Sequence, residues 1–286
     1  MKDEIQSATY FHFRAPTSIG IYAILYLGLL SKTKGWFKYA GDWQSNSLPT
    51  TYRIQRYLLK IQNKPVTING SWPNQPQHCK SFKNPCITQS ELLTGYKIRS
   101  QKVLKVSRIE ICFVGRLEPK KGFDIFMECL ISLRAELRQE ISKIHIVGSG
   151  PLQNRYKDRL TNSLLPCIFY GNLSREEVHK VYSNCDALVL PSVTEGFPKV
   201  VVEAMNYGCV PVVTNMSSIR EVVTSKNGFL IAGHSEEKLK EQIVNMLQLK
   251  PERFRSMLKN SERDLSDYTY DSYNVEISNL IGLQDK

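Results

Sequence analysis

Residues 190–208 read LPSVTEGFPKVVVEAMNYG, and the expected fold of the chain is built outward from them. An apolar strand is predicted at Asp186–Leu190 and a helix at Pro198–Tyr207. Glu195 therefore lies between the carboxyl end of a strand and a helix N-terminus, whose unpaired N–H groups favour anions and hydroxyl acceptors. The three consecutive valines are poor helix formers in isolation, so we expect burial to hold this helix in place.

Glu203 lies eight residues beyond Glu195, inside an otherwise apolar run. A carboxylate in such surroundings is costly unless it is paired or bound to a ligand. One interpretation is a ligand-binding glutamate. The other is an i, i+4 ion pair with Lys199, which contributes only tenths of a kcal/mol at an exposed site. The apolar neighbours favour the first interpretation.

Apolar strands alternate with helices on both sides of this stretch. The further strands are predicted at Ile109–Val114, Lys143–Val147, Cys167–Tyr170 and Val210–Thr214. The further helices are predicted at Phe123–Leu137, Leu152–Leu160, Ser174–Ser183, Ile219–Val223 and Glu236–Leu247. Continuous apolar strands joined by helices predict a parallel sheet covered on both faces, which is a Rossmann-like domain. Ligands of such sheets bind beyond the carboxyl ends of the strands.

Two glycine-containing loops follow the first two of these strands. Residues 115–122, GRLEPKKG, bring three cations to the binding edge, and Arg and Lys side chains there predict a phosphate site. The alternative is a solvated basic loop. Residues 147–151, VGSGP, permit close backbone approach, but the third glycine of a dinucleotide fingerprint is missing. A tight turn with Pro151 at the first helical position explains most of that second pattern.

The first hundred residues have a weaker pattern. Strands are predicted at Tyr10–Phe13 and Trp36–Ala40, joined through a turn and an apolar helix at Ile19–Leu30. Residues 45–97 look loop-like, apart from a helix at Tyr52–Lys60 and a strand at Val66–Asn69. The amino-acid composition changes at residues 101–110. We therefore expect an N-terminal domain at 1–105, a ligand-binding domain at 106–265 and a closing C-terminal helix at 266–286.

The composition of the chain limits the classes of partner that we expect. The 38 Lys and Arg residues exceed the 27 Asp and Glu residues, giving a net charge of +11 that favours anionic partners. No run of five cations occurs, so nucleic acid is not expected. The seven scattered cysteines predict reduced core thiols and a cytoplasmic protein, with no signal peptide. Residues 19–30 are shorter than the roughly 20 needed to span a bilayer and are interpreted as a buried helix. Peripheral contact with an anionic membrane stays an option.

Four segments together resemble a known family. They are GRLEPKKG, IVGSGPL, YGNLSREEVHKVYSNCDALVLPSVTEGFPKVVVEAMNYGCVPVVT and IREVVTSKNGFL, all between residues 109 and about 232. They are similar to the retaining glycosyltransferases of family 4, the glycosyl transferases group 1. That resemblance implies a GT-B fold, in which two Rossmann-like domains face a cleft and the C-terminal domain binds a nucleotide-sugar donor such as a UDP- or GDP-sugar.

The resemblance also implies site residues. Arg116 and Lys121 would neutralise the donor diphosphate, and with Glu195 they would form the catalytic set. The backbone of Gly196, Phe197 and Pro198 would hold the sugar hydroxyls beside Glu195. The remaining donor-binding positions would be Glu203 at the ribose, Asn172 and Leu173 at the base, and Gly115, Gly148 and Gly150 in the glycine loops. No DxD motif is present, so neither a metal nor another cofactor is expected.

The N-terminal half fits the family less well, because its opening strands and glycine-rich first loop are not found. Residues 1–105 correspond to about two thirds of an acceptor domain, which gives a GT-B fold with a complete C-terminal and an incomplete N-terminal domain. Many relatives carry a histidine where this chain has Ala40, Gly41 and Asp42, and His12 is interpreted as structural.

Two functional classes stay open. One is an active transferase that moves a sugar with retention to a glycan or lipid-linked acceptor in surface polysaccharide assembly, as in exopolysaccharide, capsule or lipopolysaccharide. It predicts a closed cleft. The other is a truncated, inactive or subunit-type nucleotide-sugar-binding protein, which predicts an exposed sheet edge near Tyr10–Phe13. A nicotinamide oxidoreductase is disfavoured, because VGSGP lacks both the third glycine and the acidic ribose-binding residue.

Overall fold

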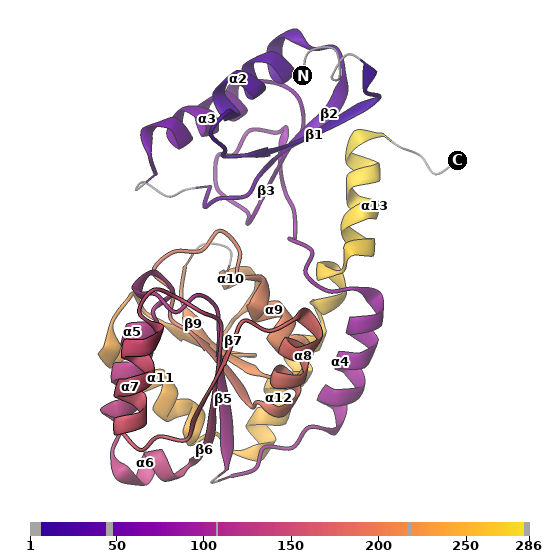
Figure 1. Ribbon diagram of the computed structural model, residues 1–286. Helices are drawn as coiled ribbons and strands as arrows, with labels where there is room; N and C mark the ends of the chain where they lie inside the picture. Colours follow the sequence, from indigo (N-terminus) through magenta and orange to yellow (C-terminus); the bar gives the residue numbers. More distant parts are fainter. Residues whose placement is uncertain (1–6, 44–47, 107, 217–218, 283–286) are drawn as a thin grey trace. The chain divides into compact units, whose positions relative to one another are not determined.

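The structure, a computed structural model, describes residues 7–43, 48–106, 108–216 and 219–282. The chain divides into two units (Figure 1). The first contains Met1–Pro85, Glu195–Phe197 and Tyr270–Lys286, and the second contains Cys86–Thr194 and Pro198–Thr269. The first division along the chain thus falls between residues 85 and 86, whereas the sequence suggested 105 and 106.

The second unit is built on a six-stranded parallel sheet in the order β10-β9-β8-β5-β6-β7. Its strands are β5 (Ile109–Val114), β6 (Ile141–Val147), β7 (Cys167–Gly171), β8 (Ala187–Leu190), β9 (Val210–Thr214) and β10 (Phe229–Ile231). The chain winds outward from β5 to β7, returns to β8 beside β5, and winds outward again. This is the doubly wound Rossmann order, and its direction reverses between β5 and β8. The expected α/β class with parallel strands is confirmed.

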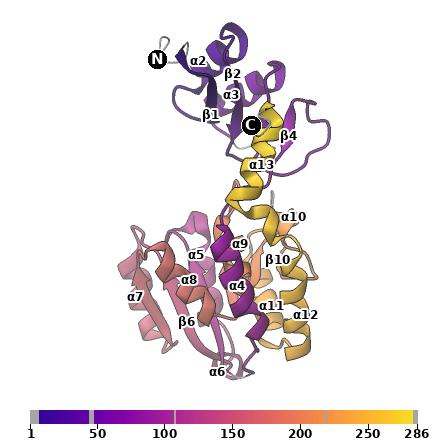
Figure 2. The same ribbon diagram turned by 90° about the vertical axis from the view of Figure 1, so that its right-hand side faces the viewer.

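Helices cover both faces of this sheet (Figures 1 and 2). One group contains α5 (Phe123–Ile131), α7 (Gln153–Asn162) and α11 (Glu236–Leu247). The other contains α4 (Gln89–Gln101), α8 (Arg175–Asn184), α9 (Lys199–Asn206) and α12 (Pro251–Glu262). Shorter helices are α6 (Ala135–Gln139), α10 (Ile219–Val222) and the 3-10 turns η2 (Pro119–Lys121) and η3 (Leu265–Tyr268).

Two helix predictions needed correction. The single helix expected at Phe123–Leu137 is broken into α5 and α6. The Arg138 side chain donates to the carbonyls of Leu133, at 2.9 Å, and Ile131, which satisfies the backbone at the break. The loop expected up to residue 97 instead contains α4, which starts with a capping box formed by Thr88 and Glu91.

Helix α4 is fastened along α9 (Figure 2). The Asn206 side chain donates to the Glu91 carbonyl at 2.8 Å, and the Arg99 guanidinium donates to the Asn206 carbonyl at 2.6 Å. Beyond the helix, Lys102 Nζ donates to the carbonyls of Tyr182 and Tyr207, each at 3.2 Å. Because these bonds satisfy carbonyls at the C-terminal ends of α8 and α9, the segment from 86 to 102 belongs to the second unit.

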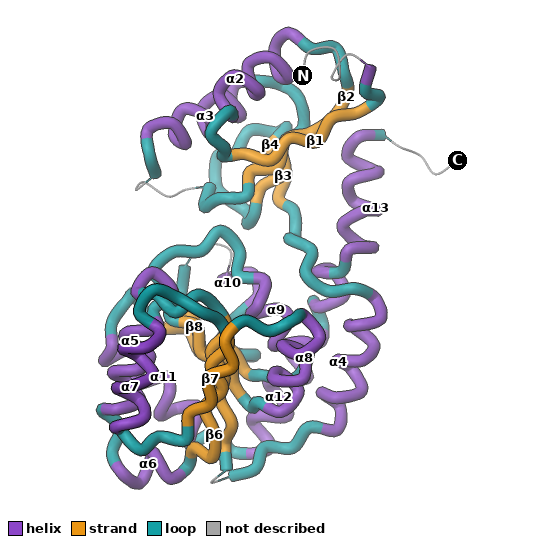
Figure 3. Tube along the Cα trace, in the orientation of Figure 1, coloured by secondary structure: helices purple, strands orange, loops and turns teal. Residues whose placement is uncertain are grey.

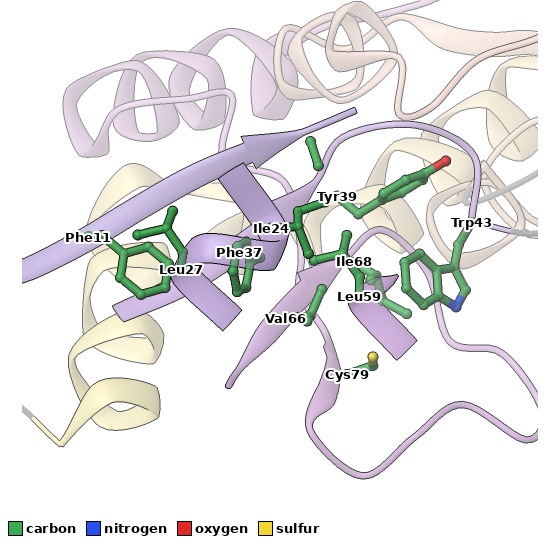
Figure 4. Packing of buried hydrophobic residues seen from close by; sticks show 11 residues of the cluster. Phe11, Ile24, Leu27, Phe37, Tyr39, Trp43, Leu59, Val66, Ile68 and Cys79 are labelled. Carbon is green, nitrogen blue, oxygen red and sulfur yellow. The ribbon is translucent and has the colours of Figure 1, made fainter. Parts of the chain in front are cut away.

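The first unit has a four-stranded parallel sheet in the order β1-β2-β3-β4. Its elements are β1 (Tyr10–Ala15), α2 (Gly20–Leu25), the π-helix η1 (Tyr26–Leu30), β2 (Lys34–Tyr39), α3 (Thr50–Ile61), β3 (Val66–Ile68), β4 (Cys79–Ser81) and α13 (Tyr270–Ile281). Its core gathers Phe11, Phe37 and Tyr39 with aliphatic side chains of α2, η1, α3 and β3 (Figure 4). Within the described residues β1 pairs only with β2, so its outer edge is open.

The apolar helix expected to be buried at residues 19–30 is buried on one side only. Ala23, Ile24 and Leu27 belong to the buried side, whereas Tyr22 and Leu30 are 76% and 75% exposed. The prediction of a buried helix was therefore wrong for half of its surface. In the part of the chain that the structure describes, no helix combines the length and the apolar content needed to cross a bilayer.

The α4–α9 contact gives a stability prediction. A Cβ added to Gly95 would lie 2.3 Å from Asn206 Nδ2 and 2.5 Å from the Asn206 carbonyl oxygen. We expect Gly95→Ala to destabilise the second unit by about 1–3 kcal/mol, although alanine is the better helix former. Chemical denaturation followed by circular dichroism would measure this. Lys97→Ala, on the exposed side of the same helix, should change stability by less than about 0.5 kcal/mol, and an equal effect of both changes would contradict the packing argument.

Candidate functional site

Loops gather at one end of the sheet of the second unit (Figure 3). Backbone hydrogen bonds join the loops at the carboxyl ends of β5, β6, β7 and β8 to one another. Gly115 N donates to the Val147 carbonyl at 3.0 Å, and Gly148 N donates to the Gly171 carbonyl at 2.7 Å. On the other side of β5, Val193 N donates to the Lys120 carbonyl at 3.0 Å. The four loops therefore form one continuous rim, which includes the point between β5 and β8 where ligands of doubly wound sheets bind.

Glycine is needed in this rim because neighbouring backbone occupies the space of a side chain. A Cβ on Gly148 would lie 1.9 Å from the Gly115 carbonyl oxygen, and one on Gly150 would lie 2.1 Å from that of Leu117. Gly122 has a φ of 73°, and its Cβ would lie 2.0 Å from the Pro191 carbonyl oxygen. The glycines were expected to allow close approach of a ligand. In the structure they first allow the adjacent loops to pack closely against one another.

The predicted phosphate-binding cations lie on this rim. The Arg116 side chain is 70% exposed, and its Nε is 3.3 Å from Glu118 Oε2. An exposed pair of this kind contributes little, so an incoming phosphate can replace the carboxylate. Lys121 is the last residue of η2 and is half-buried. The positive charge expected at the end of β5 is therefore in place.

The loop after β7 carries the two residues assigned to a nucleobase. Asn172 is exposed, and its Oδ1 accepts from Ser149 Oγ at 3.0 Å. Leu173 is half-buried beside it. The bond between Ser149 and Asn172 joins the loops after β6 and β7, so the side chains at this end of the rim are held as well as its backbone.

Helix α9 begins at the rim. Pro198 is its N-cap residue and offers no side-chain cap bond, so the first N–H groups of the helix have no side-chain acceptor from that position. Glu203 is one turn further and only 8% exposed. Its Oε1 accepts from Arg175 Nη1 at 3.0 Å, so Glu203 forms an ion pair with Arg175 of α8, a partner that the sequence did not predict.

Arg175 is the centre of a larger network. Its Nε and Nη2 donate to the two carboxylate oxygens of Glu91, at 2.7 and 2.8 Å, and Nη2 also donates to the Cys86 carbonyl. One guanidinium thereby binds α4, α9 and the segment before α4. Such charge-assisted, bidentate bonds are the strong ones.

The two carboxylates have opposite pKa shifts. Burial raises the pKa of Glu203, and the charge of Arg175 limits that rise. Burial also acts to raise the pKa of Glu91, but the hydrogen bond and charge of Arg175 and the Thr88 N–H outweigh it and lower the pKa to about 2. Glu91 is therefore ionised at neutral pH, whereas at Glu203 burial favours the neutral form and the charge of Arg175 opposes it.

The remaining predicted residues fall in the first unit. Glu195, Gly196 and Phe197 are half-buried and are grouped with it, whereas Pro198 and Glu203 belong to the second unit. His12, interpreted as structural, stacks on Trp36 with ring centroids 4.5 Å apart.

Arg175 and Glu91 were absent from the predicted site. Arg175 is the first residue of α8 and directly follows the N-cap Ser174, but a cation at the first position of a helix carries no ligand signal by itself. Glu91 could have been found, because Thr88-Gln-Ser-Glu91 is a capping-box sequence that marks the start of α4. Among the described residues, no group of three or more His, Cys, Asp or Glu side chains could hold a metal ion.

Comparisons with known proteins agree on one family. A model of the glycosyl transferases group 1 matches residues 96–264, more than half of the chain. Glycogen synthase 2 of Methylococcus capsulatus is 26% identical over 188 residues, which is 59% of this chain and 37% of that protein. Over the first curated relatives, the match spans 32–42% of their own length.

Solved structures resemble the whole chain. HepE of Anabaena, in complex with UDP, has a TM-score of 0.75 at 18% identity, covering 99% of this chain and 82% of that one. A sucrose-phosphate synthase of Thermosynechococcus elongatus has a TM-score of 0.71 at 16% identity, covering 95% and 72%. At these identities the likeness shows the fold.

The Glu91–Arg175 pair makes stability depend on pH. A carboxyl whose folded pKa lies near 2 and whose ordinary value is 4.5 stabilises the fold above pH 4.5, and that stabilisation is lost as pH falls toward 2. When the pH is lowered from 5 to 3, we expect the free energy of unfolding of the wild type to fall by about 1–2 kcal/mol more than that of Glu91→Gln, which keeps the capping box. Denaturation at several pH values would test it. Glu176→Gln, an exposed change on α8, should leave the pH profile as it is, and identical profiles for Glu91→Gln and wild type would refute the assignment.

Proposed function

The chain belongs to the glycosyl transferases group 1 and has the GT-B type of α/β fold, and from this premise we propose that it transfers a sugar from a nucleotide-sugar donor. The observation that carries the proposal is the rim at the β5–β8 reversal. It joins exposed cations, a helix N-terminus and a buried glutamate within a sheet of the doubly wound order.

The donor would lie along the rim in a defined direction. Arg116 and Lys121, after β5, would bind the diphosphate, and Asn172 and Leu173, after β7, would contact the base. Glu203 would accept from the ribose hydroxyls. Gly115, Gly148 and Gly150 would contribute backbone. This order follows the loops from the centre of the sheet to its β7 edge, and the bond between Ser149 and Asn172 supports it.

The sugar would be held at the start of α9. Glu195 and the backbone of Gly196, Phe197 and Pro198 would bind its hydroxyl groups. As the anomeric C–O bond breaks, negative charge grows on the leaving diphosphate. Arg116, Lys121 and the N-terminal N–H groups of α9 would stabilise that charge without reorganisation, which is the catalytic role we assign to the two cations.

We extend the proposal to the substrates of the reaction and to the cellular location of the protein. The donor is a UDP-sugar, because the similar HepE structures contain UDP and UDP-glucose, and a GDP-sugar is the alternative. The reaction proceeds with retention onto a glycan or lipid-linked acceptor in surface polysaccharide assembly. The protein would work in the cytoplasm, with peripheral contact at the inner face of the membrane.

A second candidate function has support from the first unit. Within the described residues the outer edge of β1 is open, and such an edge can pair with another strand. This favours a subunit that binds the nucleotide sugar and works beside another polypeptide. Turnover by the isolated chain separates the two candidates, because both require donor binding and only the first requires catalysis.

Calorimetry with UDP, UDP-glucose and GDP would test the donor site. We expect Arg116→Ala to weaken UDP binding roughly tenfold or more, because it removes charge-assisted bonds to the diphosphate. Glu203→Gln should weaken binding as well while retaining the side-chain shape. Arg134→Ala, at an exposed position before α6 away from the rim, is the matched control. Unchanged affinity in both Arg116→Ala and Glu203→Gln would remove the proposed site.

The proposal also predicts that no metal ion is needed. With the diphosphate neutralised by Arg116, Lys121 and α9, excess EDTA should change UDP affinity and sugar transfer by less than about twofold. Calorimetry and a product assay in chelator-treated buffer would measure this. Restoration of a lost affinity by Mg²⁺ or Mn²⁺ would contradict metal-independent binding.

A further inference from the structure

Two helices of the first unit lie side by side. Gln55, in the middle of α3, accepts from Thr17 N at 3.0 Å and donates to the Thr17 carbonyl at 2.8 Å, just before α2. Near their ends, Lys64 Nζ donates to the carbonyls of Ser31 and Thr33, at 2.9 and 2.6 Å, just after η1. The continuous helix α2–η1 therefore runs in the same direction as the second half of α3, and the two helices are drawn in Figure 1.

Both helices present large apolar side chains to solvent. We call this set the apolar face, and its residues are Ile19, Tyr22, Leu25, Leu29, Leu30, Ile54, Tyr57 and Ile61. On α3 these residues recur three and four positions apart, so they share one side of the helix. Large apolar side chains exposed on two adjacent helices of a folded protein indicate a surface for interaction.

The surroundings of the apolar face are strongly basic. Residues 16–64 contain seven Lys or Arg residues and one acidic residue, Asp42. A hollow of about 440 Å³ on α3 is lined by Arg53, Arg56 and Lys60 together with Ile54 and Tyr57. Cationic and apolar side chains thus share one surface, with the cations able to reach outward from it.

A second hollow lies where η1 ends. It measures about 360 Å³ and is lined by Lys32, Lys34 and Lys64 with Leu280 and Ile281 of α13. Leu29 and Leu30 of the apolar face lie a few residues before Lys32 and Lys34 in the chain. Lys64 already donates to two carbonyls, whereas Lys32 and Lys34 are exposed. An apolar surface next to these two exposed lysines fits a ligand with both an apolar body and a negative head.

We propose that the apolar face and the two basic hollows form a docking surface for an anionic phospholipid bilayer. The apolar side chains would enter the boundary between headgroups and acyl chains, and the lysines would bind headgroup phosphates. A protein partner fits less well, because the buried centre of protein interfaces is depleted in lysine and other charged residues. This docking surface would provide the peripheral membrane contact of the proposed function, and it includes no donor-site residue.

Vesicle co-sedimentation of the full chain tests this surface. Wild type should bind vesicles of phosphatidylcholine mixed with phosphatidylglycerol, bind phosphatidylcholine alone far less, and be released by salt. The double variant Leu29→Glu/Leu30→Glu and the double variant Lys32→Glu/Lys34→Glu should each lower the affinity by about tenfold or more. All four residues lie at the surface or line a hollow, and circular dichroism would verify that the variants fold.

Matched controls lie in the second unit. Leu93→Glu changes an exposed helical leucine to an acid, and Arg155→Glu/Lys157→Glu changes the net charge as much as the lysine pair does. Both controls should bind like wild type. Equal loss in the controls, equal binding to both vesicle types, or no binding by wild type would overturn the proposal. So would self-association that the leucine variant abolishes without any vesicle binding. UDP calorimetry on the same variants should be unchanged, so failure of this surface is distinguishable from failure of the donor site.

Discussion

The guanidinium of Arg175 is the contact on which the proposed ribose site depends. It lies at the first position of α8 and binds Glu203 on α9, Glu91 on α4 and the carbonyl of Cys86. Without it, Glu203 would be a buried carboxylate that has lost its ion pair with Arg175, and burial would favour its neutral form. The same bonds hold the start of α4 against the sheet-covering helices. Arg175 thus links the charge state of a proposed ligand-binding residue to the attachment of the segment that leads into the second unit.

The two units differ in how completely they bury their apolar surface. In the second unit, helices lie on both faces of a sheet of six strands, and α4 is fastened to α9 through Gly95, Arg99 and Asn206. In the first unit, four strands leave the outer edge of β1 open within the described residues, and α2–η1 buries one side only. A helix that is apolar all round requires cover on every side. The first unit is therefore where an additional partner has most to bury.

The sequence predicted the second unit well because its strands are short, continuous apolar runs rich in β-branched residues, and this length and composition distinguish them from helices. It failed where the deciding contact is distant in sequence. Glu203 was identified as costly to bury, yet its partner Arg175 lies 28 residues earlier on another helix. The same holds for α4, whose helical pattern is weak and whose stability comes from α9. It also holds for residues 19–30, since composition indicates that an apolar helix needs cover and cannot say what supplies it.

The glycines of the rim have a further consequence. Gly122, Gly148 and Gly150 each place their α-carbon where a neighbouring loop carbonyl leaves no room for a side chain. The loops are therefore preformed, and little backbone freedom is left to lose when a ligand arrives. Side chains that project from the rim, such as those of Arg116 and Asn172, can be exchanged without moving this backbone. Such a scaffold allows a lineage to change what it recognises by single substitutions, while the cost of assembling the site stays the same.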